Sequence, residues 1–408
     1  MRWFYRCPVC GASYDIEPGR YLCDRCARDQ QRARPLAGVL EAEWEGDWAP
    51  ADGEIPLPVE RSWFPSIPVG GTPLWAPQRL REELGFPGLF LKDDTANPTG
   101  SLKDRASLLV AAFARKFGIR EVALASTGNA ASSMAGIGAA AGLAVTVFLP
   151  ASAPRAKRIQ VLQYGATLRQ VEGSYDVAYE RSLEYTSSGP ALSRNTAHNP
   201  LTIEGKKTAA FEIVRQLGDA VDAPAAGAGD RRSQPFGREV APDHLFVPTG
   251  DGVILAGLYR GFENLLRLGR IEGMPTVWAC QAEGSSAIAR ALASGGFGDP
   301  VPSRTIADSI AVDVPRNGAH ALAKLTRYGG RAVSVSDEEI LAAQYHLASR
   351  TGLFAEPSSS AAYACFRKVS GSIAPQSRVV LLVTGSGLKD IESAARGLGS
   401  DRTAPSGA

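Results

Sequence analysis

The chain has 408 residues, 44% of them apolar and 21% charged, which is the balance of an ordinary globular protein with a sizeable core. Its formal net charge of +2 gives no broad electrostatic case for nucleic acid or an anionic membrane as a partner. No apolar run of about 18 residues predicts a transmembrane helix, and the N-terminus lacks an apolar signal segment, so we expect a cytoplasmic protein.

The first 35 residues are predicted to form a zinc-ribbon-like module. Four of the six cysteines lie there as two Cys-x2-Cys pairs, Cys7 with Cys10 and Cys23 with Cys26. In a chain without an export signal, such clustering favours a metal over disulfides. Four thiolates at this spacing are typical of a closed, tetrahedral, structural Zn²⁺ site, and four thiols without metal are the alternative.

Residues 36–68 are rich in Trp, Pro and acidic side chains and predict an extended connector. Residues 69–399 alternate short apolar runs with Ala-rich stretches, which predicts an α/β core with mostly parallel sheets. Eight runs are expected to be strands: 89–91, 121–125, 144–149, 167–171, 244–247, 277–280, 332–335 and 379–383. Ala, Gly, Pro and charged residues at 219–243 predict a flexible surface insertion, and residues 400–408 predict a disordered tail.

The segment NPTGSLKDRA at 97–106 ends a strand, and the Ala-rich stretch that follows predicts a helix capped by Ser101 or Thr99. Lys103 then falls in the first turn, where a cation is unfavourably placed. A reason to keep it there is a lowered pKa, because a neutral amine can attack a carbonyl. The local sequence by itself favours the alternative, a solvated lysine paired with Asp104.

Two further loops follow strands and open helices, STGNAA at 126–131 and PTGDGVILAG at 248–257. Their glycines permit close backbone approach, and the N–H groups at a helix start attract a carboxylate or a phosphate. Simple helix capping is the alternative for both. With the opener GGTPL at 70–74, the lysine segment and VTGSGLKD at 383–390, these loops form an ordered set of motifs.

This ordered set resembles the fold-type II pyridoxal-phosphate (PLP) enzymes, the tryptophan synthase β-like family. The resemblance implies two parallel-sheet, three-layer domains, with the smaller one at about 105–200, in a homodimer. It implies that Lys103 attaches the cofactor as a Schiff base and moves protons. The other implied cofactor contacts are Asn129 at the phenolic oxygen, Thr384 at the pyridine nitrogen, and Gly250, Asp251, Gly252, Val253 and Ile254 at the phosphate. The implied contacts to the substrate carboxylate are Ser126, Thr127 and Gly128.

Three residues raise separate questions. Related enzymes commonly place Asn where this chain has Asp251, and a carboxylate would repel the phosphate, so we expect Asp251 to point away or to cap the helix. Glu356 has either a structural or a catalytic role. His198 is the histidine expected to lie nearest the pocket.

Within the family, the TGSGLKD ending and the segments RNTAHNP at 194–200 and EGKKT at 204–208 resemble threonine synthases. Those enzymes convert O-phospho-L-homoserine and water to L-threonine and phosphate. The run GSYDV at 173–177 departs from their pattern near the substrate phosphate, so cysteate synthase and a threonine or serine dehydratase are alternatives. A zinc-ribbon binding module on an inactive PLP-fold scaffold is the non-enzyme alternative. The near-neutral charge and the intact lysine, asparagine and threonine motifs count against it.

Overall fold

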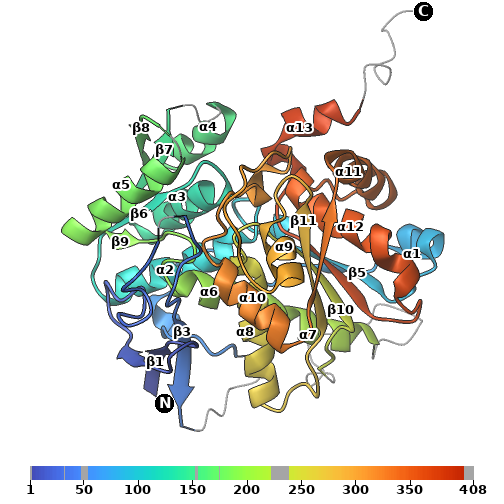
Figure 1. The fold of residues 1–408 in the computed structure, drawn as a ribbon, viewed down its shortest axis with the longest axis horizontal. Coiled ribbons are helices and arrows are strands. Elements are labelled where there is room, and N and C mark those ends of the chain that lie inside the picture. The colour runs from blue at the N-terminus through green and yellow to red at the C-terminus, as the bar shows by residue number, and fades with distance from the viewer. Residues whose placement is uncertain are drawn as a thin grey trace, which may run out of the picture.

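The computed structural model describes residues 2–31, 33–46, 54–151, 155–173, 175–221 and 239–398, without the side chains of 155–157 and 221. These residues form three sheets, of three, four and six strands. Figure 1 shows the four-stranded and six-stranded sheets on opposite sides of the molecule, with the N-terminal sheet below them. Among the described residues, no helix combines the length and apolar character needed to cross a bilayer.

The N-terminal sheet is antiparallel, in the order β2-β1-β3. Its strands are β1 (Arg2–Arg6), β2 (Ser13–Asp15) and β3 (Glu41–Glu45). Strand β3 comes from the segment predicted as a connector and pairs with β1 along its whole length. The sequence EAEWE does not by itself predict a strand. The cations that pair with its glutamates lie far away in the chain. Glu41, for example, is buried against Arg260 and Lys324.

The four-stranded sheet is parallel throughout, in the order β8-β7-β6-β9. Its strands are β6 (Glu121–Ala125), β7 (Ala144–Pro150), β8 (Thr167–Val171) and β9 (Leu192–Ser193). The surrounding helices are α2 (Lys103–Lys116), α3 (Asn129–Ala141), α4 (Arg155–Gln163) and α5 (Tyr175–Ser188). Small side chains on α3 and the apolar face of α2 pack together in the core beside β6 and β7.

The six-stranded sheet has the order β12-β11-β10-β13-β5-β4 and is parallel except for β4, which is antiparallel to β5. Its strands are β4 (Leu74–Trp75), β5 (Leu89–Asp93), β10 (His244–Pro248), β11 (Thr276–Ala282), β12 (Arg331–Val335) and β13 (Val379–Val383). The last strand of the chain therefore lies inside the sheet. It is paired with β5 on one side and with β10 on the other.

Helices cover both faces of this sheet, which explains why its central strands are apolar throughout. One face packs against α1 (Gln78–Leu84), α11 (Asp337–Thr351) and α12 (Pro357–Val369). The other packs against α7 (Thr208–Val221), α8 (Val253–Arg267), α9 (Ala287–Ser294) and α10 (Gly318–Arg327). Helix α6 (Leu201–Lys206) contacts both α2 and α8, and α13 (Ile391–Arg396) follows the last strand. Single 3-10 turns are η1 (Arg61–Trp63), η2 (Asp94–Ala96), η3 (Asp308–Ile310), η4 (Ser370–Ser372) and η5 (Gly387–Lys389).

The predicted α/β class and all eight predicted strands are confirmed, several with one or two more residues at an end. The predicted place of Lys103 in the first turn of α2 is confirmed, but the predicted cap was wrong, because Leu102 is the N-cap and no side chain caps the helix. Thr99 instead donates its hydroxyl and its N–H to the carboxylate of Asp104. Residues 219–221 of the expected insertion complete α7, and 222–238 lie outside the described residues, as does the expected tail at 400–408.

Candidate active site

All eleven residues predicted to bind the cofactor or a substrate carboxylate line one cavity of about 410 Å³. It lies at the carboxyl ends of β6, β10 and β13, where loops from both large sheets meet. In α/β proteins, ligands bind in such a crevice beyond the carboxyl ends of parallel strands. The fold therefore brings together motifs that lie between residues 103 and 384 of the chain.

Lys103 is the first residue of α2 and reaches the cavity. Leu102, just before it, donates its N–H to the carbonyl of Thr384 at 2.9 Å, which ties the helix start to the end of β13. Burial lowers the pKa of Lys103 below its usual range; Glu356 opposes this shift, and Arg194 adds to it. Its ammonium has no ion-pair or hydrogen-bond partner in the described part of the chain, and the alternative of a pair with Asp104 is not seen.

Asn129 is the first residue of α3 and points its amide at Glu356. The amide nitrogen lies 3.0 Å from both carboxylate oxygens and 3.2 Å from the hydroxyl of Ser309. Glu356 is buried, and a Cβ on Gly385 would lie 2.5 Å from its Oε1, so only glycine fits there. These contacts fix the orientation of the Asn129 side chain at the cavity wall.

The loop before α8 requires glycine at two positions. A Cβ on Gly250 would lie 2.9 Å from the Cα of Ile310, and Gly252 has a φ of +84°. Gly252 is the N-cap of α8 and no side chain caps this helix, so Asp251 does not take the second of its two expected roles. The Asp251 carboxylate instead accepts the N–H of Arg316 at 3.1 Å. Burial raises the pKa of this carboxyl, while the contact with Arg316 opposes the rise.

Thr384 follows β13, and its hydroxyl lies 2.9 Å from that of Ser359. The Ser359 oxygen also accepts the N–H groups of Thr384 and Gly385, at 3.0 and 2.8 Å. A neutral hydroxyl pair therefore occupies this end of the cavity. Such a pair can hydrogen-bond a ring nitrogen without requiring that nitrogen to be protonated.

The structure also places residues in the cavity that the sequence analysis did not assign. They include Lys206, Tyr175, Thr196 and the segment from Asp308 to Val314. The motif EGKKT at 204–208 contains Lys206 and was the available signal for it. His198, the histidine expected to lie nearest the pocket, is absent from the cavity lining, and its ring packs at a tilt against Tyr21, with ring centroids 4.6 Å apart.

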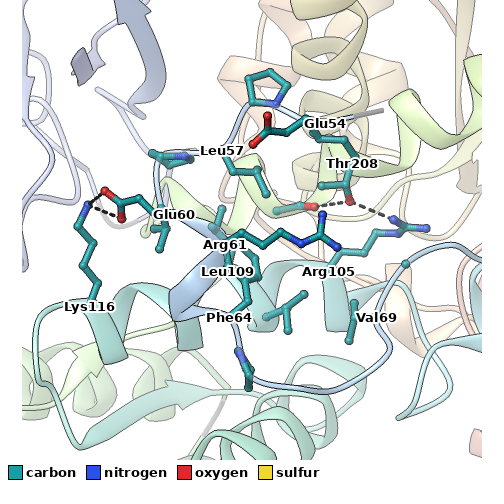
Figure 2. A pocket seen from close by; sticks show the side chains of 18 of the residues that line it. Glu54, Leu57, Glu60, Arg61, Phe64, Val69, Arg105, Leu109, Lys116 and Thr208 are labelled. Carbon is teal, nitrogen blue, oxygen red and sulfur yellow. Dashed lines mark hydrogen bonds and ion pairs between the residues drawn. The ribbon is translucent and has the colours of Figure 1, made fainter. Parts of the chain in front are cut away.

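A larger cavity of about 1280 Å³ lies between the connector, α2 and α7, and it contains none of the predicted site residues. Figure 2 shows two of its charged side chains already satisfied, Lys116 by Glu60 and Arg105 by Thr208. Arg105 also pairs with Glu212 at 2.6 Å. The residues predicted to act on a bound molecule therefore lie in the smaller cavity.

The four N-terminal cysteines form a separate cluster, in which all four sulfurs lie within 4.8 Å of one another. The sulfurs of Cys7 and Cys26 are 3.7 Å apart, and those of Cys10 and Cys23 are 3.5 Å apart. A tetrahedral zinc site with Zn–S bonds of about 2.3 Å separates its sulfurs by about 3.8 Å. Both the donor set and its spacing therefore fit Zn²⁺.

Comparisons with known proteins agree with this geometry. Residues 66–385 match the family model described as pyridoxal-phosphate dependent enzyme. Threonine synthase of Methanosarcina acetivorans is 34% identical over 94% of this chain and 92% of its own length. Threonine synthase of Methanocaldococcus jannaschii is 32% identical over 96% of this chain and 94% of its own length.

Solved structures with lower identity share the fold. An L-serine ammonia-lyase from Rhizomucor miehei aligns with a TM-score of 0.66 and 20% identity, covering 80% of this chain and 97% of its own. Threonine deaminase isoform 2 from Solanum lycopersicum aligns with a TM-score of 0.63 and 21% identity, covering 80% of this chain and 83% of its own.

Proposed function

Since the chain belongs to the family of pyridoxal-phosphate dependent enzymes, we propose that it is a threonine synthase, a lyase that converts O-phospho-L-homoserine and water to L-threonine and phosphate. The observation that carries the proposal is the extent of the similarity. Two threonine synthases match this chain over 94% and 96% of its length. The cavity contributes the chemistry that such a reaction needs.

The residues around the cavity fit pyridoxal phosphate. Lys103 offers an amine with a lowered pKa for covalent attachment, and the glycine-rich start of α8 offers backbone N–H groups to a phosphate. Thr384 offers a hydroxyl to the ring nitrogen, and Asn129 an amide to the ring oxygen. When bound, this cofactor supplies a sink for the electrons released at the substrate Cα.

We assign the proton transfers to Lys103. Its neutral amine removes the proton from Cα of phosphohomoserine and then one from Cβ. After phosphate leaves Cγ, a proton is added at Cγ, the hydroxyl of water adds at Cβ, and a proton returns to Cα, which produces the methyl and hydroxyl groups of threonine and restores its Cα–H bond. The lowered pKa of Lys103 suits this role, because it raises the share of the amine that is neutral and can act as a base.

The substrate carboxylate is assigned to the loop of Ser126, Thr127 and Gly128, at the N-terminus of α3. The Ser126 hydroxyl accepts the N–H groups of Gly128 and Ala131, both at 3.2 Å, which holds the loop in shape. The N–H groups and dipole of a helix start favour an anion there. The departure at 173–177 includes residue 174, which lies outside the described residues.

The test is an assay of three reactions with the purified enzyme. Phosphate release should occur with phosphohomoserine, accompanied by threonine in equal amount. Phosphoserine with or without sulfite, and free threonine or serine, should give little product. Cysteate from phosphoserine and sulfite, or a 2-oxo acid from threonine, would identify the alternatives, and no turnover of phosphohomoserine would contradict the proposal.

We also propose that Cys7, Cys10, Cys23 and Cys26 bind one structural Zn²⁺. The change of Cys10→Ser is expected to remove zinc from the protein, as measured by elemental analysis. It should also lower the melting temperature, because the folding of small metal modules is coupled to metal binding. Cys365→Ser, at a buried cysteine outside the cluster, is the control and should keep the zinc content. Full zinc occupancy in Cys10→Ser would contradict the assignment.

We also propose the division of the chain into a module at 1–35, a connector at 36–68 and a core at 69–399. The smaller subdomain at about 105–200, the homodimer and the cytoplasmic location are proposed as well. Light scattering of the purified protein, with an expected mass of two chains of 43.1 kDa each, tests the homodimer.

A further inference from the structure

Lys206, the last residue of α6, has no role so far, although it lines the same cavity as Lys103. Only 1% of its surface is exposed. The one hydrogen bond recorded for its ammonium in the described residues goes to the carbonyl of Thr202, at 3.0 Å. Its neighbour Lys207 is equally buried but has an ion pair with Glu204 at 2.5 Å. A buried ammonium normally has such a carboxylate partner, so Lys206 is the exception.

The position of Lys206 relative to the phosphate loop is fixed by close helix packing. Helix α6 packs on α8 through Gly257, where an added Cβ would lie 2.8 Å from the Cβ of Lys206. A second glycine, Gly261, allows the same close approach, because its Cβ would lie 2.6 Å from the carbonyl of Lys207. Gly257 lies in the second turn of α8, just beyond the glycine-rich loop that opens this helix. The lysine is therefore held beside that loop.

The surroundings of Lys206 carry more positive than negative charge. Arg194 is fully buried, and one of its terminal nitrogens, Nη2, has no hydrogen-bond partner among the described residues. Burial, followed by the charges of Arg194 and Lys103, lowers the pKa of Lys206 well below its usual range, and Asp251 opposes the shift. Arg316, Lys103 and Lys206 are the basic groups that oppose the raised pKa of the Asp251 carboxyl. An added dianion would restore the balance of charge.

We propose that the ammonium of Lys206 binds the phosphate group of the cofactor and offsets the carboxylate of Asp251 in the phosphate loop. A carboxylate in that loop would by itself repel a phosphate. With Lys206 beside it, the pair is neutral, and the N–H groups of the α8 start remain available to the dianion. The proposal goes beyond the choice of amino-acid substrate, because it applies to any reaction of this cofactor in this cavity.

The experiment compares two ligands that differ only in the phosphate. The apoenzyme is titrated with pyridoxal phosphate and with pyridoxal, and binding is followed by absorbance. In Lys206→Met, the dissociation constant for pyridoxal phosphate is expected to rise about 10- to 100-fold, the value of a hydrogen bond to a charged group. The constant for pyridoxal should change by less than about 3-fold, because the lost contact is to the phosphate. Lys206→Arg keeps the charge and should retain most of the preference for the phosphorylated ligand.

A second substitution tests the part played by Asp251. In the background of Lys206→Met, the change Asp251→Asn should recover part of the lost affinity for pyridoxal phosphate, because the unbalanced carboxylate is removed. Lys116→Met, at a partly exposed lysine on α2, is the control and should leave both constants unchanged.

Three results would overturn the proposal. An equal loss of affinity for both ligands would mean that Lys206 only supports the fold. An unchanged affinity for pyridoxal phosphate would remove Lys206 from the phosphate site. If Lys206→Met does not fold, Lys206→Gln takes its place, and the same preference for the phosphate in Lys206→Gln and Lys206→Arg would contradict a role for the charge. None of these results depends on which amino acid is turned over, so they leave the threonine synthase proposal to its own assay.

Discussion

Lys103→Ala is expected to lower turnover by at least about 10⁴-fold and to end covalent attachment of the cofactor. The change removes the attachment point and the general base together, and a general base by itself contributes about 10²- to 10⁴-fold. Reduction with borohydride followed by peptide mapping measures attachment directly. The wild-type enzyme should carry the reduced cofactor on Lys103, and the variant should carry none.

The matched control is Lys116→Ala, at the other end of the same helix. Lys116 pairs with Glu60 at the surface, and such exposed ion pairs contribute about 0–1 kcal/mol. This variant should therefore keep both the label and the activity. A label on another lysine of the wild-type enzyme, with Lys206 the nearest candidate in the cavity, would show that the attachment site is wrongly assigned.

Arg105→Met is expected to lower the free energy of unfolding by about 3–5 kcal/mol, the usual cost of removing one partner from a buried ion pair. Its guanidinium binds the carboxylates of Asp94 and Glu212, with distances of 2.6–2.8 Å. All three side chains are buried. Without the arginine, Lys92 is the one cation left in direct contact with Glu212 among the described residues. Urea denaturation followed by circular dichroism measures the loss.

The same variant should change how stability depends on pH. Burial favours a raised pKa for Glu212, but Arg105 and Lys92 outweigh it and hold that pKa well below its usual range. A depressed pKa in the folded state adds stability above the unfolded value of about 4.3, and this contribution disappears as the pH falls below it. Wild-type stability should therefore fall on acidification, and the fall should be smaller in Arg105→Met.

Arg181→Met is the control for this prediction, because Arg181 pairs with Glu184 at the exposed surface of α5. It should cost less than about 1 kcal/mol. If Arg105→Met were as stable as this control at neutral pH, the buried network would not contribute to the fold as proposed.

The sequence predicts the strands well because the central strands of the large sheet are covered on both faces and are therefore largely apolar. The run at 379–383 is one such strand, and it is fully buried. The sequence does not predict β3, since the cations that allow Glu41 to be buried come from α8 and α10, more than 200 residues later. Ion pairs between distant segments leave no local pattern.

The candidate site, like the fold, could be predicted from the sequence only in part. Motifs at strand ends place Lys103, Asn129 and Thr384 in one cavity, because the carboxyl ends of the parallel strands in both large sheets meet there. The partners that orient them could not be predicted. Glu356 binds Asn129 across 227 positions of sequence, and Ser359 binds Thr384 through a hydroxyl that no motif marks.

The position of β13 has a consequence for synthesis on the ribosome. It joins β5 to β10, so the large sheet stays open until residue 383 has been translated. Until then the inner edges of both neighbours are unpaired, and unpaired edges are where chains associate wrongly. The pairing of β13 with β5 also joins residues that lie almost 300 positions apart, and contacts of such long sequence separation slow folding. The nascent chain therefore passes through a long interval in which these two strand edges are open to wrong pairing.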